Sequence, residues 1–211
     1  MLGMTLDGDL KWNTHIYGPG GLLSSLNQKL FLIKRISNHV NRKYLRQIAE
    51  ALFVSKIRYC LTLLGPVRWT NNDPTQSHLS DVQKCLNKLV RFLNNVTLSD
   101  RQTSVSLHKN VKMLSVNQLN AYSKILEAWK SFHTDNYPLK FEIRQETEER
   151  ATTRSTTNKI LIIKGKCAEA KNTAINDIAK VWNSTPNHIK ICESIVTAKT
   201  KIKMFVAELP F

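Results

Sequence analysis

The sequence predicts a mainly α-helical protein: a helical bundle preceded by a short β-hairpin and followed by a smaller helical region with some β structure. Apolar residues recur at intervals of three and four over six segments, which places them on one side of a helix. The apolar fraction of 42% is ordinary for a globular chain, so a buried core is expected. Glycine, proline and short polar clusters interrupt the periodic segments and predict the turns between them.

A hairpin is expected at the start of the chain. Residues 1–6 alternate loosely between apolar and polar, and residues 10–16 can form a return strand. Asp7, Gly8 and Asp9 supply a turn between them, because glycine adopts positive φ at little cost. An isolated hairpin is only marginally stable in water, so this start is expected to belong to a larger element.

Two basic helices are expected next, over residues 22–40 and 45–64. Residues 38–41 are the expected break between them, and Gly65-Pro66 ends the second helix. Lysine and arginine occupy the sides away from the apolar residues, against the single acid Glu50. The apolar stripes are formed by Leu22, Leu26, Leu30, Ile33 and Val40, then by Leu45, Ile48, Leu52, Ile57, Cys60, Leu61 and Leu64.

Two further helices are expected between residues 73 and 129. Asp73 can cap the first of them, with Pro74 at its first helical position. The third apolar stripe is Leu79, Val82, Leu86, Leu89 and Leu93. Residues 97–110 are expected to form a polar connector. Ser115 and Gln118 then have the spacing of a capping box, and the stripe that follows is Val116, Leu119, Tyr122, Leu126 and Trp129.

The last third of the chain is expected to be partly irregular. Residues 134–158 lack periodicity, so a flexible segment is expected there. Residues 159–164 contain a β-branched run that is typical of a strand. Two helices close the chain, over residues 168–183 and 195–209. The expected inward side chains are Ala174, Ile175, Ile178 and Trp182 in the first and Ile195, Ala198, Ile202, Phe205 and Leu209 in the second.

The charge of the chain is its most unusual property. With 31 Lys and Arg against 16 Asp and Glu, the formal net charge is +15. An excess of this size favours a polyanionic partner, and a charge that only keeps the chain soluble is the alternative. Because the excess recurs on several helices, contact with a phosphate backbone is the preferred interpretation. The candidate nucleic-acid-binding residues are Lys34, Arg35, Arg42, Lys43, Arg46, Lys56, Arg58, Lys84, Lys88 and Arg91.

Membrane and secretory classes are not favoured. No stretch approaches the ~18 to 20 consecutive apolar residues that span a bilayer. The first ten residues have no basic segment typical of a signal peptide. The four cysteines, Cys60, Cys85, Cys167 and Cys192, are scattered, which suits reduced thiols better than a disulfide framework. A location in the nucleus or cytoplasm, without a membrane partner, is therefore expected.

Residues that could carry catalysis or bind a metal are few. Asp7 and Asp9 are closely spaced, but the glycine between them favours a turn. His188 and Cys192 have the spacing of half a zinc site, and no Cys-x-x-Cys supplies the other half. Trp12 is expected in the core rather than stacked on a nucleic-acid base. The sequence therefore assigns no catalytic residue, no metal ligand and no cofactor.

Three segments of the chain occur together in one known family. They are residues 2–16, LGMTLDGDLKWNTHI, residues 57–67, IRYCLTLLGPV, and residues 179–186, AKVWNSTP, followed by Ile189 and a lysine-rich helix. In this order they resemble the end of the palm, the thumb and the tail of reverse transcriptases of non-LTR (LINE-like) retrotransposons. The chain departs from the family at Thr185, where the tail motif has leucine.

The resemblance implies a part of such an enzyme without its catalytic centre. Residues 1–18 would be a remnant of the palm, residues 19–110 a thumb-like helical domain, and residues 111–211 a helical tail. The metal-binding aspartates of the family lie upstream of the Leu-Gly segment, and the sequence has no Tyr/Phe-x-Asp-Asp box. Polymerase chemistry with Mg²⁺ is therefore expected only of the complete family enzyme, not of this chain alone.

The implied partners are RNA or an RNA–DNA duplex, which the chain would bind through the phosphate backbone, and a separate palm-containing chain. Two alternatives stay open. One is a helical module that binds another protein through apolar surface. The other is a transposon relic without a function.

Overall fold

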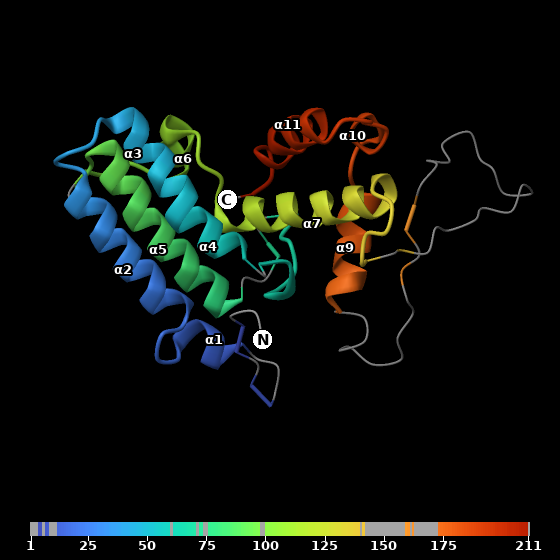
Figure 1. Ribbon diagram of the computed structural model, residues 1–211, viewed down its shortest axis with the longest axis horizontal. Helices are drawn as coiled ribbons and strands as arrows, with labels where there is room; N and C mark the ends of the chain where they lie inside the picture. Colours follow the sequence, from blue (N-terminus) through green and yellow to red (C-terminus); the bar gives the residue numbers. More distant parts are fainter. Residues whose placement is uncertain are drawn as a thin grey trace, which may run out of the picture.

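The chain is mainly helical, as the spacing of its apolar residues predicts (Figure 1). No β-strand occurs among the residues that the structure describes. A long helix connects a helical bundle at one end of the molecule to a second helical group at the other. The computed structural model describes residues 4–5, 7–8, 12–59, 61–70, 72–73, 76–97, 100–139, 141, 159–160, 162 and 173–210.

The return strand expected over residues 10–16 is wrong, because helix α1 occupies Asn13–Tyr17. The Asp7 carboxylate accepts hydrogen bonds from the backbone N–H of Trp12 (3.3 Å) and of Asn13 (2.9 Å). These bonds satisfy amide groups at the start of the helix that have no partner inside it. Asp7 therefore shapes the start of a helix rather than a hairpin turn. Residues 1–3, 6 and 9–11 lie outside the described residues.

The bundle is built from α2 (Leu22–Ile36), a second helical rod and α5 (Ser77–Asn94). The rod is continuous and consists of α3 (Arg42–Ala49), a π-helical turn η1 (Glu50–Val54) and α4 (Ser55–Arg58). It runs antiparallel to α2 and α5 (Figure 1). The break expected over residues 38–41 is confirmed, and the Asn41 side chain caps α3 by accepting from the Lys43 N–H at 3.0 Å. The rod ends at Arg58, so the predicted end of this helix at Gly65-Pro66 is wrong, and a short 3₁₀ turn, Leu61–Leu63, follows.

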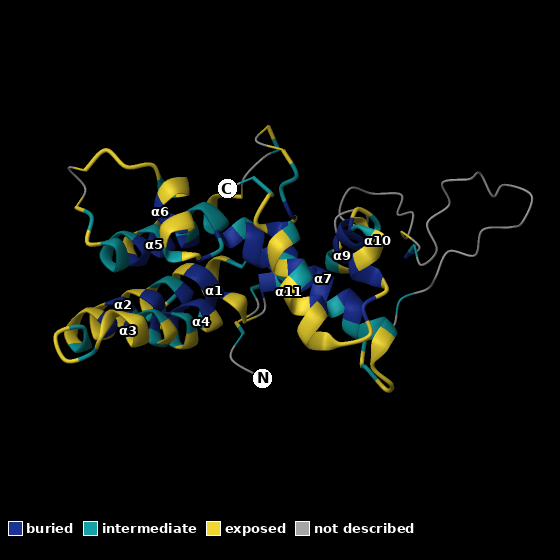
Figure 2. Ribbon diagram, turned by 90° about the horizontal axis from the view of Figure 1, so that it is seen from above, coloured by how far each residue is buried: buried dark blue, intermediate teal, exposed yellow. Residues whose placement is uncertain are grey.

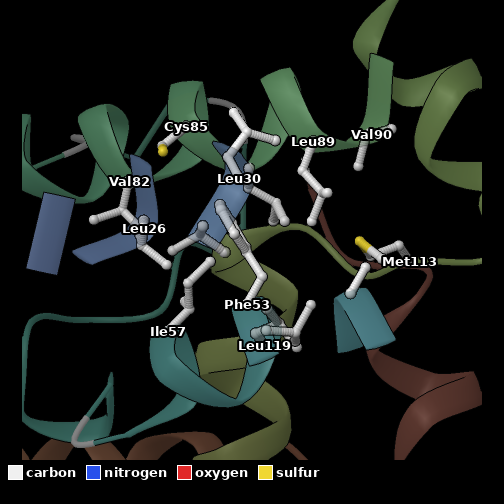
Figure 3. Close-up of a cluster of buried hydrophobic side chains, with 14 of the residues drawn as sticks. Leu26, Leu30, Phe53, Ile57, Val82, Cys85, Leu89, Val90, Met113 and Leu119 are labelled. Carbon is white, nitrogen blue, oxygen red and sulfur yellow. The ribbon is translucent and has the colours of Figure 1, made fainter. Parts of the chain in front are cut away.

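The core of the bundle contains most of the residues of the predicted apolar stripes (Figure 3). Val40 and Leu52 are only half-buried and lie outside this core, so their predicted inward positions are wrong. Leu26 of α2, Phe53 of the π turn and Leu89 of α5 are fully buried in it. Phe53 was not part of a predicted stripe, and the wider π turn is the element that carries it. Burying a side chain of this size contributes about 1.5–3 kcal/mol relative to leaving it exposed.

The predicted start of the third helix is displaced. The Asp73 carboxylate accepts from the backbone N–H of Trp69 at 2.6 Å and of Thr70 at 2.8 Å, so it closes the preceding turn. Helix α5 begins at Ser77, after Gln76. The Thr70 hydroxyl also donates to this carboxylate, at 3.0 Å. The three hydrogen bonds together lower the pKa of Asp73.

The connector expected over residues 97–110 contains a helix, α6 (Ser104–Val111). Its first turn is capped by Thr103, which accepts from the Ser106 N–H at 3.3 Å. Its buried residues are Leu107 and His108, so the helix has a single buried apolar side chain. One such residue in two turns gives no apolar stripe from which the helix could be predicted. The next helix, α7 (Val116–His133), begins with the predicted capping box of Ser115 and Gln118.

The second helical group packs around α7. It comprises α9 (Ala174–Asn183), α10 (Asn187–Lys190) and α11 (Ile195–Val206), with α9 on one side of α7 and α10 and α11 on the other (Figure 1). Trp182 is buried as predicted, but Ile175 and Ile195 are 44% and 38% exposed, so their predicted inward positions are wrong. The burial pattern shows α7 covered along most of its length (Figure 2).

Several predictions fall on residues that are not described. These residues include 142–158 of the expected flexible segment, 161 and 163–164 of the expected strand, and 168–172 of the fifth helix. Ile160 is described and buried, and its backbone N–H and C=O bond the Asn183 side chain at 2.8 and 3.0 Å. Cys85 and Cys192 are buried free thiols, whereas Cys60 and Cys167 lie outside the described residues. None of the described helices combines the length and apolar character needed to cross a bilayer.

Candidate nucleic-acid interface

Three of the predicted arginines lie along one side of the α3–α4 rod. Arg42 and Arg46 line an open cavity of about 470 Å³, here called the larger cavity. The Arg46 guanidinium is 3.4 Å from Glu50 Oε1 and 3.4 Å from the carbonyl oxygen of Lys112. Glu50, Lys112 and Arg58 in turn line a second cavity of about 200 Å³, the smaller cavity. Arg46 therefore lines the larger cavity and contacts two residues that line the smaller one.

The π turn explains why Arg46 and Arg58 share a side. Twelve residues of regular α-helix make three and one-third turns, which would leave Arg58 about 120° away from Arg46. In the π turn the Ser55 N–H bonds the Glu50 carbonyl, five residues back, so this turn holds more residues than an α turn. The wider turn reduces the angle between Arg46 and Arg58 about the helix axis. As a result, Glu50, Ser55 and Arg58 all line the smaller cavity.

Two lysines from other elements join this side. Lys112 ends α6 in the left-handed conformation (φ 52°), and Lys203 lies on α11. Both line the smaller cavity together with Arg58. Sequence reasoning assigned neither of them to the site, because only the fold brings α6 and α11 to the rod. We call the set Arg42, Arg46, Arg58, Lys112 and Lys203 the arginine edge.

Arg58 is held against an aromatic side chain. Its guanidinium carbon is 4.9 Å from the centre of the Tyr122 ring on α7, which is a cation–π distance. Burial raises the pKa of the Tyr122 hydroxyl, and the charge of Arg58 opposes that change. Tyr122 therefore keeps its proton near neutral pH. An arginine stacked on a neutral tyrosine keeps its donors free to bind phosphate oxygens in a forked geometry.

The other predicted cations are placed on different surfaces. Lys84 on α5 forms an ion pair with Asp81 at 2.8 Å, so part of its charge is compensated. Lys56 is half-buried on the rod near His15, whose pKa is lowered by burial and by the charge of Lys56. Arg91 donates to the Thr97 carbonyl at 3.4 Å.

The last four predicted cations are Lys34, Arg35, Lys43 and Lys88. Lys34 lies 5.9 Å from the centre of the Phe92 ring, which lines the larger cavity, so it stands beside the arginine edge. Arg35, Lys43 and Lys88 are exposed and line neither cavity. The structure thus brings together three of the ten predicted residues and places a fourth next to them.

A buried histidine supports the loop that carries Lys112. His108 Nδ1 is 3.0 Å from the Met113 carbonyl oxygen, and its Nε2 is 2.9 Å from the side-chain amide of Asn87. Nearby, the Gln83 side chain accepts from the Val116 N–H at 2.7 Å, at the start of α7. Burial lowers the pKa of His108, and the hydrogen bond to Met113 opposes that change only in part. The neutral imidazole is therefore the form that the fold favours.

We expect the free energy of unfolding to fall as the pH drops below about 6.5, the usual pKa of an unfolded histidine. Because the pKa of His108 is lower in the folded state, the unfolded chain binds more protons in this range, and acid favours unfolding. Urea unfolding at pH 7.5 and pH 5.0 measures the difference. His108→Gln should make the two values more alike, because a glutamine side chain takes up no proton in this range. Equal pH dependence in wild type and His108→Gln would contradict the assignment.

The remaining polar candidates do not form a metal centre. Among the described residues, no three His, Cys, Asp or Glu side chains lie close enough together to hold a metal ion. Cys192 is buried and its thiol donates to the His188 carbonyl at 3.2 Å, while the His188 side chain is exposed. Trp12 is half-buried and packs against the core of the bundle, as predicted.

The arginine edge can bind anions along a line. Five cations lie on it, and Glu50 is the one carboxylate among the described residues that line the two cavities. Such an arrangement neutralises successive phosphates without reading base sequence. In comparisons with known proteins, no family model, no curated protein and no solved structure matches the chain.

Proposed function

We propose that the chain binds the phosphate backbone of RNA or of an RNA–DNA duplex through the arginine edge, in the nucleus or cytoplasm. It would act as the thumb and tail of a reverse transcriptase of the non-LTR type. Neither a metal nor a polymerase activity is proposed for this chain alone. The net charge of +15 and the helical bundle agree with this role.

The observation that carries the proposal is the alignment of Arg42, Arg46 and Arg58. They span the 17 residues of a continuous helical rod, and the 16 steps of ~1.5 Å between the first and the last correspond to roughly 24 Å. That length covers about seven phosphates of one strand, spaced by ~3.4 Å along the helix axis. Lys112 and Lys203 widen the line at the smaller cavity. A rigid rod can therefore offer cations to several phosphates at once.

The test is a filter-binding titration of the full chain with a 20-base-pair RNA–DNA duplex. If all five cations of the arginine edge contact phosphates, the slope of log K against log salt should be about −4.5, which weakens binding roughly 500-fold between 50 and 200 mM salt. A duplex with an uncharged peptide backbone is the control and should not bind. Absence of binding at low salt, or an affinity that salt does not change, would remove the proposal.

A second candidate function has its own observation. Ile191, Val196 and Met204, on or beside α11, are each about two-thirds exposed or more. Exposed apolar side chains in one region are typical of protein-interaction surfaces. A palm-containing chain bound there would co-purify with this protein at high salt. Recovery of nucleic acid alone would count against this candidate.

A further inference from the structure

The larger cavity has a chemistry that phosphate binding does not explain. Three side-chain amides line it: Asn38 from the turn after α2, Asn95 from the end of α5 and Asn110 from the last turn of α6. An amide is neutral and offers both donors and an acceptor. A phosphate needs donors only, so the amides suit a ligand whose edge alternates donors and acceptors.

Apart from Ser37 and the two arginines, the remaining residues of the wall are apolar. Leu45, Phe92, Leu93 and Val111 contribute to it, each from an element of the bundle that is packed into the core cluster. Aromatic and aliphatic walls favour a flat, uncharged group that stacks or packs against them. The volume of about 470 Å³ lies within the ~300–1,000 Å³ that is usual for small-ligand sites.

The cavity opens beside charges that suit a phosphate. Arg42 and Arg46 line it together with the amides, and both belong to the arginine edge. A group that is flat and amide-like at one end and anionic at the other satisfies the whole lining. A nucleotide has these two parts, and unpaired bases are the usual targets when proteins recognise RNA by its base edges.

The three asparagines are exposed, and the backbone of one of them, Asn95, is fixed by the fold. Asn95 has φ 56°, the left-handed conformation that ends α5, and its N–H is bonded to the carbonyl of Phe92 at 3.1 Å. Asparagine tolerates this conformation better than most residues. The Cα atom of Asn95, and so the point from which its side chain extends, is therefore fixed next to the apolar wall.

We propose that the larger cavity holds the base of one unpaired nucleotide, while Arg42 and Arg46 contact the neighbouring phosphates. This inference rests on the proposed function of the arginine edge and adds a recognition site to it. The chain would then prefer a duplex with a bulged nucleotide, or a junction with a single strand, over a continuous duplex. The preference would come from the base itself.

The experiment compares three RNA–DNA duplexes that differ at one position: fully paired, with one bulged nucleotide, and with one bulged abasic sugar. The full chain should bind the bulged nucleotide about five- to 100-fold more tightly than the abasic bulge, the range that a stacked base contributes. The abasic bulge controls for the flexibility that any bulge adds to a duplex.

Variants locate the effect. Asn95→Gly with Asn110→Ala removes two amides, and glycine keeps the left-handed conformation at position 95. This variant should lose the preference for the base and keep its affinity for the paired duplex. Gln47→Ala, which removes an exposed amide of α3 outside the cavity, is the matched control and should keep the preference. If the double variant melts early, Asn38→Ala, in an exposed turn, tests the same cavity.

The outcomes separate the two proposals. Binding to all three duplexes with equal affinity would overturn the base site and leave the arginine edge intact. Binding to none of them would overturn the proposed function. A preference that survives in both cavity variants would place the base elsewhere and overturn the assignment of the cavity.

Discussion

Replacing Arg42, Arg46 and Arg58 with alanine together is expected to weaken binding to an RNA–DNA duplex by about 10²- to 10³-fold at 0.1 M salt. Each lost phosphate contact removes ~0.9 from the salt slope, which is about eightfold in affinity at that salt concentration. Three contacts therefore multiply to roughly 500-fold. The slope itself should become shallower by about 2.7. Filter binding over 50 to 200 mM salt measures both quantities.

A charge-matched control separates this edge from the general charge of the protein. Arg35→Ala with Lys84→Ala and Lys88→Ala also removes three positive charges, from exposed positions that line neither cavity. These positions are screened from a ligand on the arginine edge if they lie more than about 10 Å from it at 0.1 M salt. The control variant should lose less than tenfold. Equal losses in the two variants would show that net charge, not the edge, determines binding.

A second set of variants keeps the charge. Lysine at positions 42, 46 and 58 should restore the salt slope, because each ammonium still neutralises a phosphate. It should not restore the full affinity, because lysine lacks the forked donors of arginine and stacks less well on Tyr122. If the lysine variant behaves like the alanine variant, the arginines act by holding the rod in place and not by contacting phosphate.

Helices with a one-sided apolar stripe could be predicted from the sequence. Leu22, Leu26, Leu30 and Ile33 of α2 are all buried, because three- and four-residue spacing is enough to place side chains on one face. Helices α1 and α6 have no such stripe. Asp7 and Thr103 cap their first turns, and Ile16 and Leu107 are buried in the bundle core, so these short helices depend on contacts that an apolar stripe does not reveal.

The arginine edge was only partly predictable. The charge excess indicated arginines and lysines of α2 to α5, but it could not tell which of them share a side. That depended on the π turn between Arg46 and Arg58, for which the sequence has no simple signal. Lys112 is 66 residues from Arg46 in the chain and lies against it only because α6 packs on the bundle. The sequence predicted a basic surface, and the fold selected the residues.

Helix α7 shows a further limit of the stripe argument. Lys124 is not on its predicted apolar stripe and would be expected to face solvent, but it is 1% exposed. The reason is that α7 is covered on several sides by the rod, α9 and α11 (Figure 2). A helix in that position buries residues all round its axis. The charge of Lys124 is accommodated by Asp177 of α9 and by the carbonyl oxygen of Gly65 at 2.6 Å.

Lys124→Met is expected to destabilise the protein by about 3–5 kcal/mol, because it leaves the Asp177 carboxylate buried without its cation. Burial lowers the pKa of Lys124, and the charge and hydrogen bond of Asp177 oppose that change, so the contact with Asp177 favours the charged form of Lys124. For a chain of this size the loss corresponds to a melting temperature lower by roughly 6–20 °C. Circular dichroism during heating measures it. Lys130→Met, on the same helix, breaks the half-exposed pair with Glu127 and should cost less than about 1 kcal/mol.

The double variant Lys124→Met with Asp177→Leu distinguishes a lost attraction from a stranded charge. If the unpaired carboxylate causes the loss, replacing both partners with apolar side chains should recover most of the stability. The pair joins α7 to α9, whereas α11 packs against α7 through buried apolar side chains that include Ala198 and Ile202. Neither Lys124 nor Asp177 lines the two cavities, so both variants should keep the wild-type salt slope for duplex binding below their melting temperatures. A double variant that melts as early as the single variant would show that the unpaired carboxylate is not the cause of the loss.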